Sequence, residues 1–137
     1  MEVKIRQSES KEINGAKRVG DFPIVFNALK NKFGQPHDRN VDGKIKFEWN
    51  LTIEWINNGL VEADCVVRIY DYYNCDVLFR RFNIGGHSGM ALDVAYALLD
   101  DDDVTPDNIL TDKVKNKLME IGEVNYPHIW KDCDVAN

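Results

Sequence analysis

The stretch KIKFEWNLTIEW, residues 44–55, decides the fold because apolar and polar residues alternate along its whole length. Every second position is apolar, namely Ile45, Phe47, Trp49, Leu51, Ile53 and Trp55. Successive side chains of a β-strand point to opposite faces, so this alternation predicts a long strand with one buried face and one face in water. We expect the two tryptophans and the phenylalanine to anchor the core.

The residues on either side of this stretch extend it into a sheet. The sequence NNG at 57–59 predicts a hairpin turn, because Asn and Gly tolerate the positive φ that such a turn needs. Residues 60–73 then read as the return strand, NCD at 74–76 as a second turn, and VLFRRFNI at 77–84 as a third strand. VKIRQ at 3–7 is a candidate for a further short strand.

Three segments carry apolar residues at the three- and four-residue spacing of a helix face, and each is bounded by residues that favour helix ends. They are residues 21–34, with Asp21 and Pro23 at the start and Gly34 at the end; residues 87–99, with Ser88 as the N-cap; and a third from Thr105 and Pro106 to Ile121, which Gly122 ends. Residues 9–20 are polar and predict a loop, the four aspartates at 100–103 predict a solvated turn, and residues 123–137 form a tail with enough apolar residues to dock.

Together these elements predict a single α+β domain over residues 1–137, in which residues 1–20 are partly loop. We expect a three- to four-stranded antiparallel sheet with two to three helices packed on one of its faces. That face is the one that carries Trp49 and Trp55.

The composition limits the classes of partner. The 137 residues include 17 Lys and Arg against 23 Asp and Glu, and the net charge of -6 argues against direct nucleic-acid binding while leaving basic proteins open as partners. No apolar run reaches the roughly 18 residues of a membrane span, and the polar N-terminus lacks the apolar segment of a secretory signal, so we expect a cytoplasmic protein. The three cysteines form no CxxC and the three histidines no HxxxH, so we expect no disulfide framework, no metal and no cofactor.

The stretch RRFNIGGHS, residues 80–88, contains the candidate binding site. A strand, a double glycine and a helix start would bring backbone N–H groups and the positive end of a helix dipole to one point, as in phosphate and carboxylate sites. Nearby arginines would supply charge, and tyrosines at the end of the preceding strand a flat surface for stacking. The candidate ligand-binding residues are Arg80, Arg81, Gly85, Gly86, His87, Ser88, Tyr70 and Tyr72. The alternative is that the glycines serve only to turn the strand into the helix.

His87 is also the candidate for a catalytic role. Catalysis would need a partner, which Asp38, His37 or Cys75 could provide in the folded chain. The sequence contains no ordered nucleophile motif such as GxSxG, so we predict no catalytic residue.

Four short motifs occur in a fixed order: FGQP at 33–36, Glu48-Trp49, IYDY at 69–72 and IGGHS at 84–88. In this order the chain resembles a group of small proteins from phages and large DNA viruses, over roughly residues 22–99. The resemblance implies a viral accessory protein in the cytoplasm of the host cell and transfers no catalytic residue. Small viral accessory proteins often blunt host defence, either by blocking a defence protein or by sequestering a nucleotide signal.

Three functions follow as hypotheses. The first is a non-enzymatic counter-defence protein that binds and sequesters a phosphate-bearing small molecule such as a nucleotide signal. The alternative is an acidic inhibitor that binds a basic host nuclease or effector, and a second alternative is a small hydrolase that uses His87. An open sheet edge or exposed tyrosines would also favour a homo-oligomer.

Overall fold

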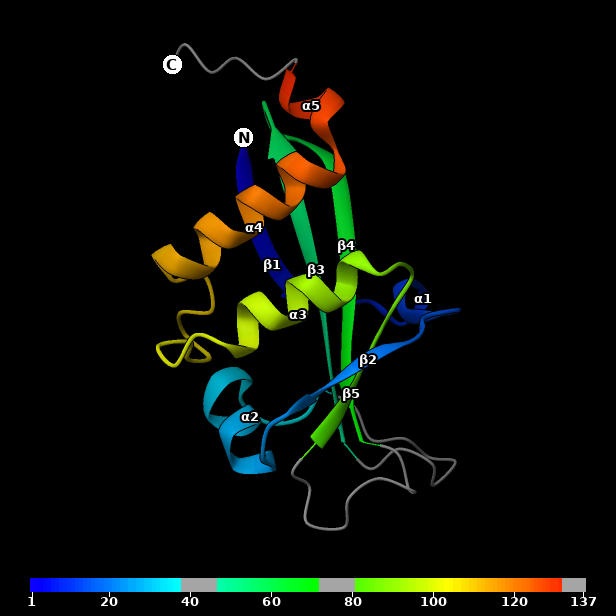
Figure 1. The fold of residues 1–137 in the computed structure, drawn as a ribbon, viewed down its shortest axis with the longest axis vertical. Helices are drawn as coiled ribbons and strands as arrows, with labels where there is room; N and C mark the ends of the chain where they lie inside the picture. Colours follow the sequence, from blue (N-terminus) through cyan, green and yellow to red (C-terminus); the bar gives the residue numbers. More distant parts are fainter. Residues whose placement is uncertain (38–46, 72–80, 132–137) are drawn as a thin grey trace.

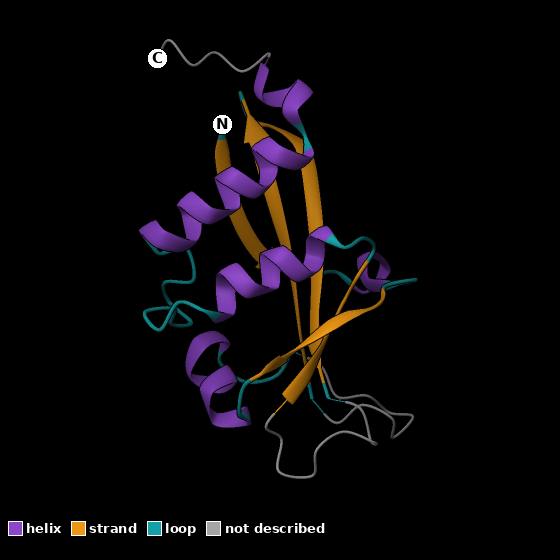
Figure 2. Ribbon diagram, viewed as in Figure 1, coloured by secondary structure: helices purple, strands orange, loops and turns teal. Residues whose placement is uncertain are grey.

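The computed structural model describes residues 1–37, 47–71 and 81–131 and shows an α+β protein built on one antiparallel sheet (Figures 1 and 2). The strands are β1 (Glu2–Gln7), β2 (Lys17–Pro23), β3 (Glu48–Asn57), β4 (Leu60–Tyr70) and β5 (Arg81–Gly86). The helices are α1 (Ser10–Ile13), α2 (Phe26–Phe33), α3 (Met90–Leu99), α4 (Asp112–Asn125) and α5 (Pro127–Lys131). The strand order is β1-β3-β4-β5-β2, so the α+β prediction is confirmed, whereas the expected numbers of strands and helices were too low for these residues.

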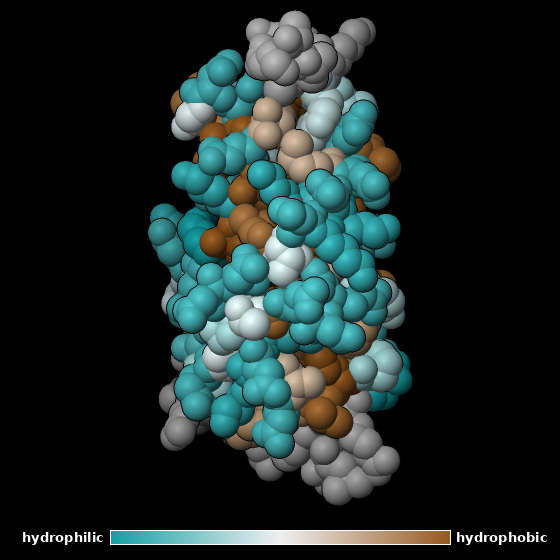
Figure 3. Space-filling model, turned by 90° about the vertical axis from the view of Figure 1, so that its left-hand side faces the viewer, coloured by the Kyte–Doolittle hydropathy of each residue, from teal (hydrophilic) through white to brown (hydrophobic). Residues whose placement is uncertain are grey.

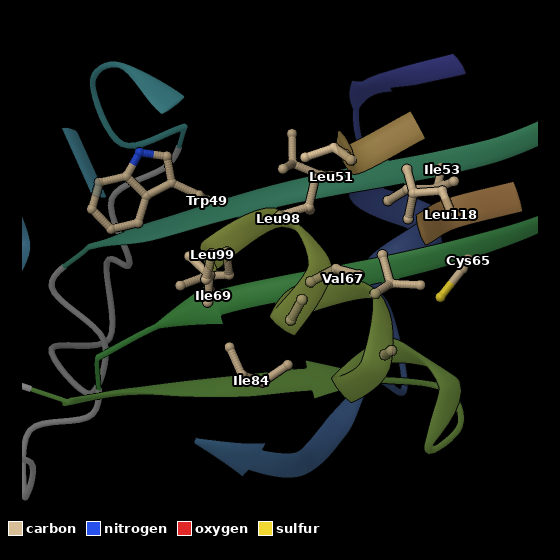
Figure 4. Close-up of a cluster of buried hydrophobic side chains, with 14 of the residues drawn as sticks. Trp49, Leu51, Ile53, Cys65, Val67, Ile69, Ile84, Leu98, Leu99 and Leu118 are labelled. Atoms are coloured by element: carbon tan, nitrogen blue, oxygen red, sulfur yellow. The ribbon is translucent and has the colours of Figure 1, made fainter. Parts of the chain in front are cut away.

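The long helices α3 and α4 lie across one face of the sheet, and α2 lies at the end of the same layer (Figure 1). From β3 this face receives Trp49, Leu51, Ile53 and Trp55, each at most 3% exposed. Figure 4 shows Leu51 and Ile53 gathered with the labelled side chains of β4 and β5 and with the leucines of α3 and α4 in one hydrophobic cluster. The alternating pattern therefore predicted the buried face of β3 correctly, and residues 44–46 of the quoted stretch lie outside the described residues.

The turn between β3 and β4 is the hairpin that the sequence predicted. Asn58 has a φ of 54° and Gly59 a φ of 80°, the left-handed pair that a two-residue hairpin turn requires. The register places Trp49 opposite Ile69, Leu51 opposite Val67 and Ile53 opposite Cys65, so these three residues of β4 share the face of Trp49.

Residues 17–23 form β2, where the sequence predicted a loop and the start of a helix. β2 pairs antiparallel with β5, and Phe22 lies opposite Phe82. Asp21 and Pro23 are therefore strand residues and do not cap a helix. Pairing with β5 gives the backbone N–H and C=O groups of both strands their hydrogen bonds, and this long-range gain outweighs the local helical spacing.

The helix predicted over 21–34 begins only at Phe26, with Val25 in the N-cap position. Its end was predicted correctly. Gly34 has a φ of 84°, and its N–H donates to the carbonyl of Lys30.

The third predicted helix is displaced toward the C-terminus. α4 begins after Thr111, whose Oγ1 accepts a hydrogen bond from Val114 N at 3.1 Å, whereas Thr105 lies in a preceding turn. Gly122 was expected to end the helix but lies within it. A Cβ at Gly122 would lie 2.5 Å from Trp55 Nε1, so the missing side chain lets α4 approach the sheet closely.

The aspartates at 100–103 include a buried carboxylate and are not merely a solvated turn. Asp101 is 4% exposed; its Oδ2 accepts from Thr111 Oγ1 at 2.5 Å and its Oδ1 from Asp103 N at 2.8 Å. The hydrogen bond from Thr111 is the main cause that lowers the pKa of Asp101. The backbone carbonyl of Asp101 accepts from the buried Lys32 Nζ, so this turn ties α2 to the start of α4.

Candidate functional site

The face of the sheet opposite α3 and α4 carries every arginine in the described part of the chain. We call it the arginine face. Its residues include Arg6 on β1, Arg18 and Asp21 on β2, Glu48, Asn50, Thr52 and Glu54 on β3, Arg68 and Tyr70 on β4, and Arg81, Asn83 and Gly85 on β5. The concentration of guanidinium groups on one face is unexpected in an acidic protein and defines the candidate site.

Each of these arginines is paired with a carboxylate. Arg6 reaches α1, where its Nη1 lies 2.7 Å from Glu12 Oε1, and this hydrogen bond is the main cause that lowers the pKa of Glu12 to about 2. At the other edge of the sheet, Arg18 and Arg81 both bind Asp21, at 2.9 Å and 2.5 Å. Bonding to Arg81 is the main cause that lowers the pKa of Asp21. Two guanidinium groups thus share one carboxylate, which leaves a local excess of positive charge.

The centre of the arginine face is a buried polar cluster formed by Glu48, Asn50 and Arg68. Glu48 and Asn50 are 3% and 4% exposed, although their positions in the alternating pattern predicted a face in water. Glu48 accepts from Arg68 Nη2 at 2.6 Å and from Asn50 Nδ2 at 3.2 Å. Asn50 Oδ1 and Arg68 Nε are buried without a hydrogen-bond partner among the described residues. Asn50 Oδ1 can therefore accept a further hydrogen bond, and Arg68 Nε–H can donate one.

His37 supports this cluster from the side. The residues after α2 run along β3, where His37 N donates to the carbonyl of Glu48 at 2.8 Å. The ring Nδ1 accepts a hydrogen bond from Asn50 N at 2.9 Å. This bond requires a neutral ring whose Nδ1 carries no proton. Burial is the main cause that lowers the pKa of His37, and the same surroundings favour this neutral form.

The double glycine predicted as a binding turn lies at the end of β5, and its two residues face opposite sides. A Cβ at Gly86 would lie 2.3 Å from Ala91 Cβ and 3.0 Å from the carbonyl of Val66, so close packing of α3 on the sheet accounts for this glycine. Gly85 belongs to the arginine face, where a Cβ would lie 3.2 Å from Tyr70 Cε1. Both glycines are buried, and ligand binding by them stays a prediction.

The residues after the glycines are exposed. His87 Nε2 lies 2.6 Å from the carbonyl oxygen of Glu12, which ties the start of α3 to α1. Ser88 is not the N-cap of α3: the N-cap is Gly89, and no side chain accepts a capping bond there. Of the partners considered for catalysis by His87, Asp38 and Cys75 lie outside the described residues, and His37 is bound to β3.

Tyr70 is not the exposed stacking surface that the sequence predicted. It is 9% exposed, and the guanidinium carbon of Arg68 lies 5.1 Å from its ring centroid. Tyr70 therefore supports Arg68 by a cation–π contact within the sheet. Tyr72 and Arg80, the remaining predicted site residues, lie outside the described residues.

The helical side of the molecule has a different surface. An open groove of about 500 Å³ runs between α3 and α4. It is lined by Asp93 of α3 and Asp100 just after it, and by Lys113, Lys117 and Glu120 of α4. Figure 3 shows a neighbouring side of the molecule, where hydrophilic side chains cover most of the surface and hydrophobic ones form small patches. This groove contains three carboxylates and two lysines, so its charge is mixed with a small acidic excess.

Few other side chains among the described residues are placed to bind a metal ion or to react. No group of three His, Cys, Asp or Glu side chains among them is placed to hold a metal ion. Burial is the main cause that raises the pKa of the Cys65 thiol to about 12, which leaves it unreactive. Across the described ranges, no helix has the length and apolar character needed to cross a membrane.

Comparison of the chain with models of protein families, with characterised proteins and with solved structures found no match. The resemblance to viral accessory proteins therefore stays a prediction, and the site is interpreted from its own geometry.

Proposed function

We propose that this protein is a non-catalytic binding protein that captures a phosphate-bearing small molecule, such as a nucleotide signal, on the arginine face. The observation that carries the proposal is the pair Arg18 and Arg81, which share the single carboxylate of Asp21. Their side chains are 57% and 54% exposed, so a ligand can reach them. Guanidinium groups bind phosphate oxygens through two parallel hydrogen bonds, which suits this pair to an anion.

The overall charge of the protein also bears on the proposal. A net charge of -6 repels anions at a distance, so capture depends on local donors. Arg18 lies opposite Gly85 in the register, and Gly85 lies opposite Arg68. Arginines thus stand on both sides of Gly85, against which the ring of Tyr70 packs. Gly85 and Arg81 belong to the site expected from the sequence, whereas Arg18 was missed.

The proposal is tested by thermal unfolding with ribose 5-phosphate, AMP, ATP and cyclic nucleotides. A ligand at 100 times its Kd adds about 2.7 kcal/mol to the free energy of unfolding. In Arg18→Gln we expect affinity for the phosphate compounds to fall roughly tenfold or more, because a charge-assisted hydrogen bond is lost. The matched control is Lys115→Gln on α4, which removes the same charge from the opposite layer and should leave affinity unchanged.

Two outcomes would contradict the proposal: no stabilisation by any of these compounds, or an equal loss of affinity in Lys115→Gln. Chromatography of the ligand after incubation separates capture from hydrolysis through His87, because capture returns the ligand intact.

The second candidate function is inhibition of a basic protein. The acidic side chains of the groove between α3 and α4 favour it, since Asp93, Asp100 and Glu120 lie there together. A salt-sensitive complex that Asp93→Asn weakens and Arg18→Gln does not would favour inhibition over capture.

A further inference from the structure

A buried polar pair on the arginine face has chemistry that a phosphate alone does not satisfy. Asn50 on β3 and Arg68 on β4 lie directly opposite each other in the register. Asn50 is 4% exposed and the side chain of Arg68 is 19% exposed. Both side chains hydrogen-bond to the carboxylate of Glu48, which therefore fixes how each is turned.

The orientation of the Asn50 amide follows from Glu48. Its Nδ2 donates to Glu48 Oε1, because the reverse orientation would place two oxygen acceptors against each other. The amide oxygen Oδ1 is thus an acceptor that no described group uses. Arg68 donates to Glu48 through Nη2, and its Nε–H has no acceptor within the described ranges. One free acceptor and one free donor result, on neighbouring strands.

Such buried atoms are costly when they stay unpaired. Each unpaired atom has lost its hydrogen bonds to water without gaining others, and proteins keep few such atoms outside functional positions. Apolar side chains at these positions would avoid the cost, as Val66 does on the same face of β4. A group that pairs both atoms at once would recover much of this free energy on binding.

We infer that Asn50 and Arg68 recognise a flat ligand group that carries a hydrogen-bond donor beside an acceptor, as the edge of a nucleobase does. The donor of the ligand binds Asn50 Oδ1, and its acceptor binds Arg68 Nε–H. This inference rests on the proposed capture of a phosphate-bearing molecule and names the other half of that molecule. It also assigns the arginine face to a nucleotide rather than to inorganic phosphate.

The register places the two halves of the site in one row across the sheet. Asn50, Arg68, Gly85 and Arg18 are consecutive partners on β3, β4, β5 and β2. Neighbouring strands lie about 4.8 Å apart, so the ends of the row are separated by about 14 Å at the backbone. A molecule with a flat polar group at one end and a phosphate at the other can contact both ends.

The test uses nucleosides, which have the base edge and no phosphate. Isothermal titration calorimetry of the full chain with uridine, cytidine, adenosine and guanosine should detect binding of at least one. Arg68→Lys should weaken that binding roughly tenfold or more, because lysine keeps the ion pair with Glu48 and lacks the Nε–H. The matched control is Arg6→Lys on β1, the same exchange at the ion pair with Glu12, which should leave nucleoside affinity unchanged.

A modified nucleoside tests the inference without any substitution in the protein, so folding of a variant does not affect the result. If uridine binds, 3-methyluridine should bind at least tenfold more weakly to the unmodified protein, because its methyl group replaces the donor that Asn50 Oδ1 accepts; N6,N6-dimethyladenosine serves in the same way if adenosine binds.

The outcomes separate this inference from the proposed function. Ribose 5-phosphate binding that depends on Arg18, without binding of any nucleoside, would overturn the inference and leave the capture of phosphate intact. Nucleoside binding that Arg68→Lys and Arg6→Lys weaken equally would also overturn it. Failure of every compound to bind would overturn both.

Discussion

The two faces of the sheet are built from the same strands and are stabilised in different ways. On the helix-covered face, β3 contributes Trp49, Leu51, Ile53 and Trp55, and packing against α3 and α4 buries them. On the arginine face, the intervening residues of β3 include Glu48, Asn50 and Thr52, which are buried equally well. Burial there depends on hydrogen bonds and ion pairs, and Asn50 Oδ1 and Arg68 Nε find no partner among the described residues.

This difference indicates which face of the sheet is suited to bind a ligand. An apolar face gains stability with every contact and has no polar atom left for a ligand. A buried polar face gains less and fixes the directions of its donors and acceptors, as binding sites require. Four experiments test whether the contrast holds.

The largest effect is expected on the apolar face. Trp55→Ala should lower the free energy of unfolding by about 4 kcal/mol, because Trp55 is fully buried and its Nε1 donates to the carbonyl of Leu118. Lys4→Ala, at an exposed position on the other face of β1, should change it by less than about 0.5 kcal/mol. Denaturant unfolding measures both, and equal effects would remove the basis of the comparison.

The next effect concerns the ion pair at the centre of the arginine face. Arg68→Met should cost about 3 kcal/mol, because it leaves the carboxylate of Glu48 buried without its cation. Arg81→Met breaks an exposed pair and should cost less than about 1 kcal/mol. Adding Glu48→Gln to Arg68→Met should restore part of the loss. A cost at Arg68 no larger than at Arg81 would show that this centre behaves as ordinary surface.

The third experiment compares two glycines near the junction of β5 and α3, Gly86 and Gly89. Gly86→Ala should destabilise the protein by about 2 kcal/mol, because the new Cβ would meet Ala91 Cβ at 2.3 Å. Gly89→Ala adds the same atom where nothing lies within 4 Å and should change stability by less than about 0.5 kcal/mol. Thermal unfolding distinguishes the two. Equal stability of both variants would leave Gly86 free for a role in binding.

The smallest effect is a dependence on pH through His37. Burial lowers the pKa of His37 in the folded state below its usual 6.5, so the unfolded chain takes up a proton first as the pH falls. The contribution of the neutral ring is therefore complete above about pH 6.5 and is lost as the pH falls through the lower folded pKa. In His37→Asn, where an amide oxygen replaces Nδ1 as the acceptor, this dependence should disappear.

Denaturant unfolding between about pH 5 and 8 measures this difference. The carboxylates with lowered pKa values, such as Glu12 and Asp21, titrate below this range and leave the comparison undisturbed. A parent protein whose stability does not change over the range would contradict the assignment of a neutral His37.

Local signals in the sequence predicted the regular parts of this fold. Strict alternation identified β3 and the apolar side of β4, and Asn58-Gly59 identified their turn. The same signals failed for β2, because its strand conformation depends on pairing with β5, some sixty residues away along the chain. They failed again at Gly122, whose place inside α4 depends on the bulk of Trp55 on another element.

Local sequence patterns suggested some residues of the candidate site, whereas the arrangement of the strands in the sheet brings the other residues together. Gly85, Gly86 and Arg81 were predicted as site residues because their residue types suit anion binding, and their role in binding stays a prediction. Arg18, Asn50 and Arg68 carry no local motif, since nothing in their immediate neighbours marks them. They meet only because β2, β5, β4 and β3 lie side by side. Periodicity reports which face a residue occupies, whereas partners across a sheet are set by register, which connects residues far apart in the chain.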